Sequence, residues 1–143
     1  MKVTLLLADA AQSVDNKLYI LGGGWSITGP DPVPSAIALK IDVPWDQTNQ
    51  RHRWELALQD ADGVPVFVGD DENPQAIVIG NEFELGRPPG IAPGTPLELT
   101  MAINLLPLPL PPGRYVWQLA IDDQSHEDWS VGFSVRAPET VEA

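Results

Sequence analysis

The sequence contains no cysteine. This excludes disulfide bonds and thiolate metal sites, and it favours a reducing compartment such as the cytoplasm. Basic residues are also few, with 8 Lys and Arg against 20 Asp and Glu and a net charge of −12. Such a field repels phosphate backbones and anionic lipid, so we expect neither nucleic acid nor a membrane as a partner. The charge is compatible with a solubilising surface or with a basic protein partner.

Long apolar runs are missing as well. No stretch approaches the roughly 20 residues of a membrane-spanning helix. The run from Val3 to Ala8, followed by the triplet Ala8-Asp9-Ala10, imitates a secretory signal. It is shorter than the roughly 7–15 residues of the apolar region of a true signal. We therefore predict a cytoplasmic protein.

Helical periodicity is the third absence, and 15 prolines with 12 glycines would interrupt most helices. The sequence instead alternates apolar and polar residues, as strands with one buried face do. The clearest segments are AIALKIDV, RWELALQ, LELTMAIN, RYVWQLAID and DWSVGFSVR. Weaker candidate strands are 3–8, 18–25 and 76–85, the last with a bulge or break at Gly80-Asn81, and 46–51 has room for one helical turn.

This pattern of short strands separated by turn residues predicts an all-β fold. We expect one domain over residues 1–137, an antiparallel β-sandwich of about eight strands of the immunoglobulin or C2-like type. A closed β-barrel is the alternative. We expect the polar end, residues 138–143, to be a frayed tail.

The stretch KLYILGGGWSITGPDPVP resembles a nucleotide-binding loop at first sight. A phosphate-binding loop needs Lys and Ser or Thr after its last glycine, whereas Pro30 and Asp31 follow Gly29 here. A kelch propeller needs repeats of the same pattern, and there is one copy. We interpret Gly22–Gly24 as a bulge or bend, which leaves open whether Trp25 packs in the core or faces a partner.

The residue types that carry chemistry are scattered. His52 and His126 have no partner at metal-ligand spacing, and neither has a convincing nucleophile beside it. The acidic clusters 70–72 and 122–128 lack a calcium-loop pattern, so we interpret them as solvated turns, with Ca²⁺ binding as the alternative. Asp62-Gly63 predicts a hairpin turn. We expect no catalytic residue, no metal and no cofactor, and hence no enzyme.

Candidate binding residues come from two other features. Leu106, Leu108 and Leu110 lie in the proline-rich LLPLPLPPG, which predicts a stiff crossing whose leucines cap the sandwich, or a polyproline II ligand or partner surface if they are exposed. Among 5 tryptophans, the sequence does not settle the burial of Trp25, Trp45 and Trp129. Exposed rings would suit a sugar, and buried rings would be core anchors.

Three segments together are familiar: LLLADAAQSVDNKLYILGGGWSI, WELALQDADGVPV and LPPGRYVWQLAIDD. They resemble an uncharacterised family of small bacterial proteins, a domain of unknown function, over roughly residues 3–135. The resemblance implies a compact β-sandwich and brings no catalytic residues. Members often have Cys-Asp where this chain has Ala8-Asp9.

We therefore hypothesise a non-catalytic binding or assembly module that recognises a protein partner or associates with itself, for example as a homodimer. The alternative is a small-ligand or carbohydrate-binding protein, or a weak hydrolase, that uses its end loops and exposed tryptophans.

Overall fold

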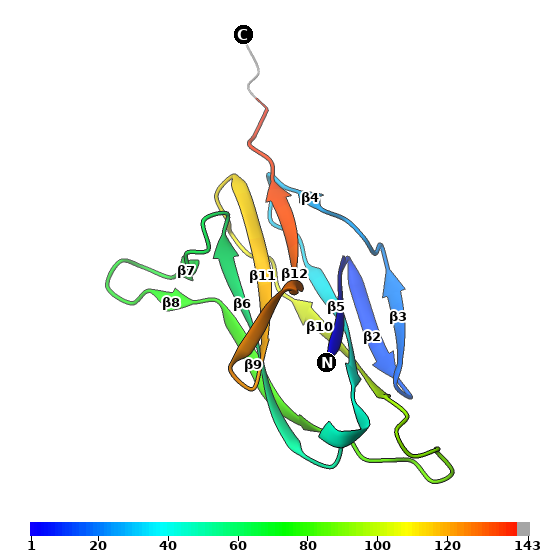
Figure 1. Ribbon diagram of the computed structural model, residues 1–143. Coiled ribbons are helices and arrows are strands. Elements are labelled where there is room, and N and C mark those ends of the chain that lie inside the picture. Colours follow the sequence, from blue (N-terminus) through cyan, green and yellow to red (C-terminus); the bar gives the residue numbers. More distant parts are fainter. Residues whose placement is uncertain (140–143) are drawn as a thin grey trace.

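The structure is a computed structural model that describes residues 1–139, so positions 140–143 of the expected tail lie outside the described residues. The chain forms short and long strands with one 3-10 turn (Figure 1). In chain order these are β1 (Lys2–Ala8), β2 (Ala10–Val14), β3 (Lys17–Leu21), β4 (Ile27–Thr28), β5 (Ser35–Val43), η1 (Trp45–Gln47), β6 (Arg51–Asp60), β7 (Phe67–Val68), β8 (Gln75–Ala76), β9 (Val78–Glu84), β10 (Leu97–Leu105), β11 (Gly113–Ile121) and β12 (Gln124–Val135).

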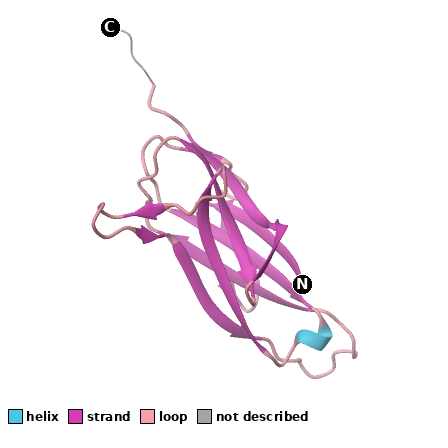
Figure 2. Ribbon diagram, turned by 60° about the vertical axis from the view of Figure 1, so that its left-hand side comes forward, coloured by secondary structure: helices cyan, strands magenta, loops and turns pink. Residues whose placement is uncertain are grey.

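Two sheets pack face to face. One has the strand order β1-β5-β10 and the other the order β4-β12-β11-β6-β9, and Figure 2 shows the elongated molecule that they form. The predicted all-β sandwich is confirmed, and the sheets do not close into a barrel. The pairing is antiparallel except for the short contact between β4 and β12, which is parallel. No helix within residues 1–139 has the length and apolarity needed to cross a bilayer.

The core lies between these two sheets and follows from the alternation in the sequence. In β5 the residues Ile37, Leu39, Ile41 and Val43 point inward, and in β11 the residues Tyr115, Trp117, Leu119 and Ile121 do so. Trp117 is the largest fully buried side chain. Because successive strand residues point to opposite faces, the residues between them, among them Lys40, Asp42 and Gln118, lie on the outer faces.

A third layer covers the outer face of the three-stranded sheet. Strands β2 and β3 form a two-stranded ribbon, and β2 lies against β5 and β10. A second, separate cluster of buried residues fills this contact, and its fully buried members are Ala8, Ala11, Ala36 and Ala38. Alanine has the short side chain that lets two layers of backbone approach closely, so β5 carries large residues on one face and alanines on the other.

Several local expectations are corrected by the structure. Strand β2 was not predicted, and β3 ends at Leu21 instead of running on to Trp25. The ladder of β9 with β6 continues through Gly80 without a bulge, and the break lies at Ile77 instead. A Cβ atom on Gly80 would come within 2.9 Å of the Trp54 carbonyl oxygen, so close backbone approach explains this glycine. The expected helical turn appears as η1.

The alanine contact yields a stability prediction. Replacing Ala38 by leucine inserts a bulky side chain between β5 and the ribbon, where the wild-type residue is 2% exposed. We expect Ala38→Leu to lower the free energy of unfolding by about 1–3 kcal/mol in urea titration. The matched control is Ala57→Leu on the half-buried outer face of β6, which should change little. Equal stability of the two variants would contradict the close packing of the ribbon.

Candidate functional site

One end of the sandwich brings three predicted site residues together. Trp25, Leu108 and Leu110 line a single cavity between two proline-rich segments, and Asp31 and Ser35 add polar groups to its wall. The cavity volume is about 40 Å³. A single buried water needs roughly 10–15 Å³, whereas pockets for small organic ligands have roughly 300–1,000 Å³. The cavity therefore suits a few waters or one small apolar group.

The glycine run explains how Trp25 reaches this end. Gly22 and Gly24 adopt φ values of 61° and 91°, which glycine reaches without strain. They carry the chain from β3 back across β1, where the Gly24 N–H donates to the Leu7 carbonyl oxygen at 2.7 Å. Trp25 then packs edge-on against Phe133 at a centroid distance of 5.7 Å. Trp25 thus packs at the margin of the core.

The second proline-rich segment, residues 106–112, crosses between β10 and β11. The Tyr115 hydroxyl donates to the Pro111 carbonyl oxygen at 2.6 Å and so holds the end of the crossing. Burial, with a smaller contribution from the charge of Asp60, raises the pKa of Tyr115 above its usual value, so the hydroxyl keeps its proton for this bond. Leu108 and Leu110 pack against the core, whereas Leu106 is 83% exposed and does not line the cavity.

The other two candidate tryptophans lie apart from this cavity. Arg87 stacks over the Trp45 ring with its guanidinium carbon 3.9 Å from the ring centroid, so one face of that ring is covered. Trp129 is 7% exposed and belongs to the core. The structure therefore does not assemble the three candidate tryptophans into one platform.

His52 forms the best-organised polar site among the described residues. Its Nδ1 lies 2.7 Å from Asp122 Oδ2, and its Nε2 lies 2.7 Å from the Gln47 carbonyl oxygen. Both partners accept hydrogen bonds, so the charged ring, which donates from both nitrogens, satisfies the site. Burial opposes the charged ring, but the bonds to Asp122 and Gln47 and the Asp122 charge outweigh it and raise the pKa of His52.

The same pair fixes the turn between β11 and β12. Asp122 Oδ1 accepts from the Arg53 N–H at 3.0 Å, and Asp122 and Asp123 adopt positive φ values, as a two-residue hairpin turn requires. Burial opposes ionisation of Asp122, but the bonds from His52 and Arg53 outweigh it and lower the pKa of Asp122. With both imidazole nitrogens engaged, the pair links η1 to β6 and to the turn after β11, and it leaves no nitrogen free to act as a base.

A different surface stands out on the β2–β3 ribbon. Its outward face carries Val14, Tyr19 and Leu21, and Tyr19 and Leu21 are 57% and 71% exposed. Beside it lies an open hollow of about 620 Å³, lined by Ala10, Ala11, Gln12, Tyr19, Ile20, Leu21 and Asn104. In Figure 1, β3 lies at the outer edge of the molecule with no strand beyond it among residues 1–139. The ribbon thus combines a free strand edge with exposed apolar side chains.

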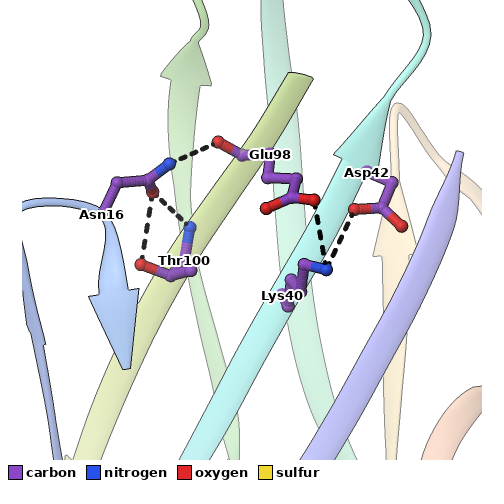
Figure 3. Close-up of polar contacts among 5 residues, drawn as sticks. All are labelled: Asn16, Lys40, Asp42, Glu98 and Thr100. Carbon is purple, nitrogen blue, oxygen red and sulfur yellow. Dashed lines mark hydrogen bonds and ion pairs between the residues drawn. The ribbon is translucent and has the colours of Figure 1, made fainter. Parts of the chain in front are cut away.

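Side-chain amides fasten this ribbon to β10. Asn104 accepts from the Ala11 N–H at 3.3 Å and donates to the Ala11 carbonyl oxygen at 2.9 Å. At the other end, Asn16 accepts from the Thr100 N–H at 2.9 Å and donates to the Glu98 carbonyl oxygen at 2.7 Å (Figure 3). Each amide imitates one rung of a sheet. Asn16 caps the backbone of β10 at Glu98 and Thr100, whereas Asn104 caps the backbone of β2 at Ala11, and β3 remains the outermost strand.

An ion-pair cluster neighbours the Asn16 clamp. Lys40 on β5 lies 3.3 Å from Glu98 and 3.6 Å from Asp42, as Figure 3 shows. Its hydrogen bond with Glu98, together with the charges of Asp42 and Glu98, raises the pKa of Lys40. These side chains occupy the outer face of the sheet beyond the ribbon, where β5 changes from alanine to charged residues.

Tyr19 and Leu21 are not among the binding residues that the sequence predicts. A signal was present in the segment Leu18-Tyr19-Ile20-Leu21, which is apolar at every position. Continuous apolar strands are usual where both faces are buried. The structure packs Leu18 against the alanine cluster and leaves Ile20 on the same face 37% exposed, whereas Tyr19 and Leu21 on the other face are 57% and 71% exposed. The apolar character of that other face is therefore unexplained by the fold of one chain.

The clamp between Asn104 and Ala11 can be tested directly. Asn104→Ala leaves the Ala11 N–H and carbonyl group without this partner, and we expect the free energy of unfolding to fall by about 1–3 kcal/mol. Hydrogen exchange of the ribbon amides should speed up in parallel. Gln12→Ala is the control because Gln12 is exposed on the same ribbon. A loss of stability in the control equal to that in Asn104→Ala would argue against the clamp.

The His52 site predicts a pH dependence of stability. The pKa of His52 is higher in the folded state than the unfolded value of 6.5. The charged ring therefore contributes fully to the free energy of unfolding below pH 6.5, and this contribution is lost as pH rises through the folded pKa. The free energy of unfolding in urea should therefore decline from about pH 5.5 to about pH 9, and His52→Gln should make this decline smaller. His126→Gln is the control and should keep the decline. A decline of the same size in His52→Gln would refute the assignment.

No curated protein is detectably similar to the chain in sequence. Residues 3–135 match the model of a family of unknown function, DUF6941, which spans both sheets and the ribbon. The match covers nearly the whole chain and agrees with the resemblance found in the sequence. The chain belongs to this family, DUF6941.

Proposed function

We propose that this protein is a non-catalytic interaction module that binds a protein partner along strand β3. The observation that carries the proposal is the coincidence of an unpaired strand edge with exposed apolar side chains at Tyr19 and Leu21. Exposed apolar edges template pairing with another chain, and strand addition is a common mode of peptide recognition. Main-chain hydrogen bonds would give affinity, and the hollow beside Tyr19 would give specificity.

The other sheet edges of the described residues are less suited to this role. At the edge of β10, Asn16 and Ser13 of the ribbon already occupy the carbonyl oxygens of Glu98 and Thr100 and the Thr100 N–H. Strand β9 carries Glu82 and Glu84, and charges on an edge discourage pairing. Strand β4 has two residues, and β1 lies beside β12. Among the edges of the two main sheets and the ribbon, that of β3 is therefore the best suited.

The polar groups support a non-catalytic role. Both nitrogens of His52 are engaged by acceptors, as described above. Near His126, the Ser130 hydroxyl donates to the Glu127 carbonyl oxygen at 2.9 Å, and the His126 ring packs edge-on against Trp129. In a Ser–His pair the serine hydroxyl donates to the imidazole, and neither histidine accepts from a serine in this arrangement.

The small-ligand alternative has weaker support. The end cavity that contains Trp25 has a volume of about 40 Å³, Arg87 covers one face of Trp45, and Trp129 is buried. A carbohydrate platform needs an open aromatic face, and these rings offer little. The net charge of −12 supports a protein partner over nucleic acid or an anionic membrane. A bacterial source and a cytoplasmic location are part of the proposal, supported by the resemblance and by the absence of cysteine.

Photo-crosslinking in the native host tests the proposal. We replace Tyr19 by p-benzoylphenylalanine and expect a discrete adduct with a protein, because the ring lies on the proposed surface. The matched control places the same residue at Phe67 on β7, which is 56% exposed against 57% for Tyr19. Adduct formation at position 19 should disappear in a second variant that also carries Leu21→Lys. Absence of any adduct at position 19, or equal adducts at both positions, would overturn the proposal.

A further inference from the structure

We propose that the occupant of the β3 edge is a second copy of this chain, with two β3 strands paired antiparallel and Tyr19 on the twofold axis. The inference rests on the proposed function and specifies its partner. It follows from three properties of residues 9–22: the backbone groups that are free, the side chains that would meet, and the placement of two charges.

The hydrogen-bond pattern of the hairpin selects the register. Val14 and Lys17 close a two-residue turn, so this pair is hydrogen-bonded and the pairs alternate along the ribbon. Ala11 faces Ile20 and gives both of its backbone groups to Asn104, which agrees with a non-hydrogen-bonded pair at that position. The N–H and C=O groups of Leu18 and Ile20 therefore point away from β2, toward the open edge.

A twofold axis at Tyr19 uses all four of these groups. In an antiparallel pair centred there, Leu18 of one copy lies opposite Ile20 of the other, and the two symmetric pairs form four hydrogen bonds. An axis at Leu18 would pair Leu18 with itself and place Ile20 opposite Asn16. An axis at Ile20 would pair Ile20 with itself and place Leu18 opposite Gly22. Asn16 and Gly22 both lie outside the strand. The free backbone of β3 is thus complementary to itself in one register.

The side chains agree with that register. Tyr19 would face Tyr19 of the second copy in a non-hydrogen-bonded pair, the geometry in which side chains approach most closely. Leu21 would lie diagonal to that tyrosine and opposite the stem of Lys17. Tyr19 and Leu21 would then lose water from the surfaces that one chain leaves exposed, which accounts for an apolar strand with an uncovered face.

Charge complementarity supplies the third argument. The Asp9 carboxylate lies over Gly22, immediately beyond Leu21, and Lys17 stands at the opposite end of β3. Within residues 1–139 the ion pairs involve neither Lys17 nor Asp9. In the proposed register Lys17 reaches the Leu21 end of the second copy, where Asp9 is located, and the twofold axis makes two such contacts. Opposite charges so placed steer and orient association.

Engineered cysteines test the register, because the chain has no cysteine of its own. We expect purified wild-type protein to have the mass of a dimer by light scattering. Under mild oxidation Tyr19→Cys should form a covalent dimer, since facing residues of a non-hydrogen-bonded pair lie about 4.5 Å apart, within disulfide range. Leu21→Cys is the control. Its two copies would be four positions apart along the strands, roughly 13 Å, and should not crosslink.

A second variant keeps the tyrosine. Lys17→Cys combined with Leu21→Cys places facing cysteines on both sides of an intact Tyr19 and should form a covalent dimer, whereas each single substitution should not. A wild-type protein that is monomeric at high concentration would overturn the inference. So would a dimer in which only the control variants crosslink, or in which no cysteine on β3 does.

Charge reversal gives an independent readout. Lys17→Glu alone places Glu near Asp9 twice, and Asp9→Lys alone places Lys near Lys17 twice, so each homodimer should dissociate about tenfold more readily. Mixing the two variants should restore wild-type affinity as a heterodimer, because both contacts again join opposite charges. Failure of the mixture to recover would count against the register, since a mere folding defect would persist in both.

The outcomes separate the two proposals. Photo-adducts at position 19 that contain only other proteins, together with a monomeric purified chain, would leave the interaction module standing and refute self-association. A dimer that forms without β3 would refute the inference alone. Absence of both adducts and dimer would refute the interaction module and the inference together.

Discussion

The first half of strand β5 is covered on both faces, and the rest of the structure depends on that double burial. Its large residues face the five-stranded sheet, while Ala36 and Ala38 face the β2–β3 ribbon. Close-packed interiors leave little room for added volume, so the ribbon occupies its place only because alanine stands at these positions. The arrangement turns a two-layer sandwich into three layers over part of its surface, and it moves the exposed edge from β10 out to β3.

The position of the ribbon is also determined by polar contacts that imitate a sheet. Asn104 and Asn16 each satisfy one backbone N–H and one carbonyl group across the gap between the ribbon and β10. Side-chain amides can do this where the strands diverge too far for a direct ladder. A strand edge held in this way is preorganised, because little further ordering is needed when another strand pairs with it.

The other polar clusters also hold secondary-structure elements together. His52 and Asp122 join η1, β6 and the turn that follows β11, and the charged ring satisfies two acceptors at once. Arg87 lies over Trp45 and donates to the carbonyl oxygen of that residue at 2.7 Å, which secures the start of η1. Side chains of types that are often catalytic here hold strand ends and turns together. The exposed apolar surface of β3 is the feature that has no such structural role within one chain.

The sequence by itself determined the fold class, the strands with clear alternation and the cap formed by Leu108 and Leu110, because these follow from local periodicity. Only the tertiary structure decided that Trp129 is buried, that the Trp54 carbonyl oxygen on β6 leaves no room for a Cβ atom at Gly80, and that one face of β3 is uncovered. Each of these depends on which distant strand lies opposite. The sequence of an apolar strand does not show whether its second face packs against its own chain or against another chain.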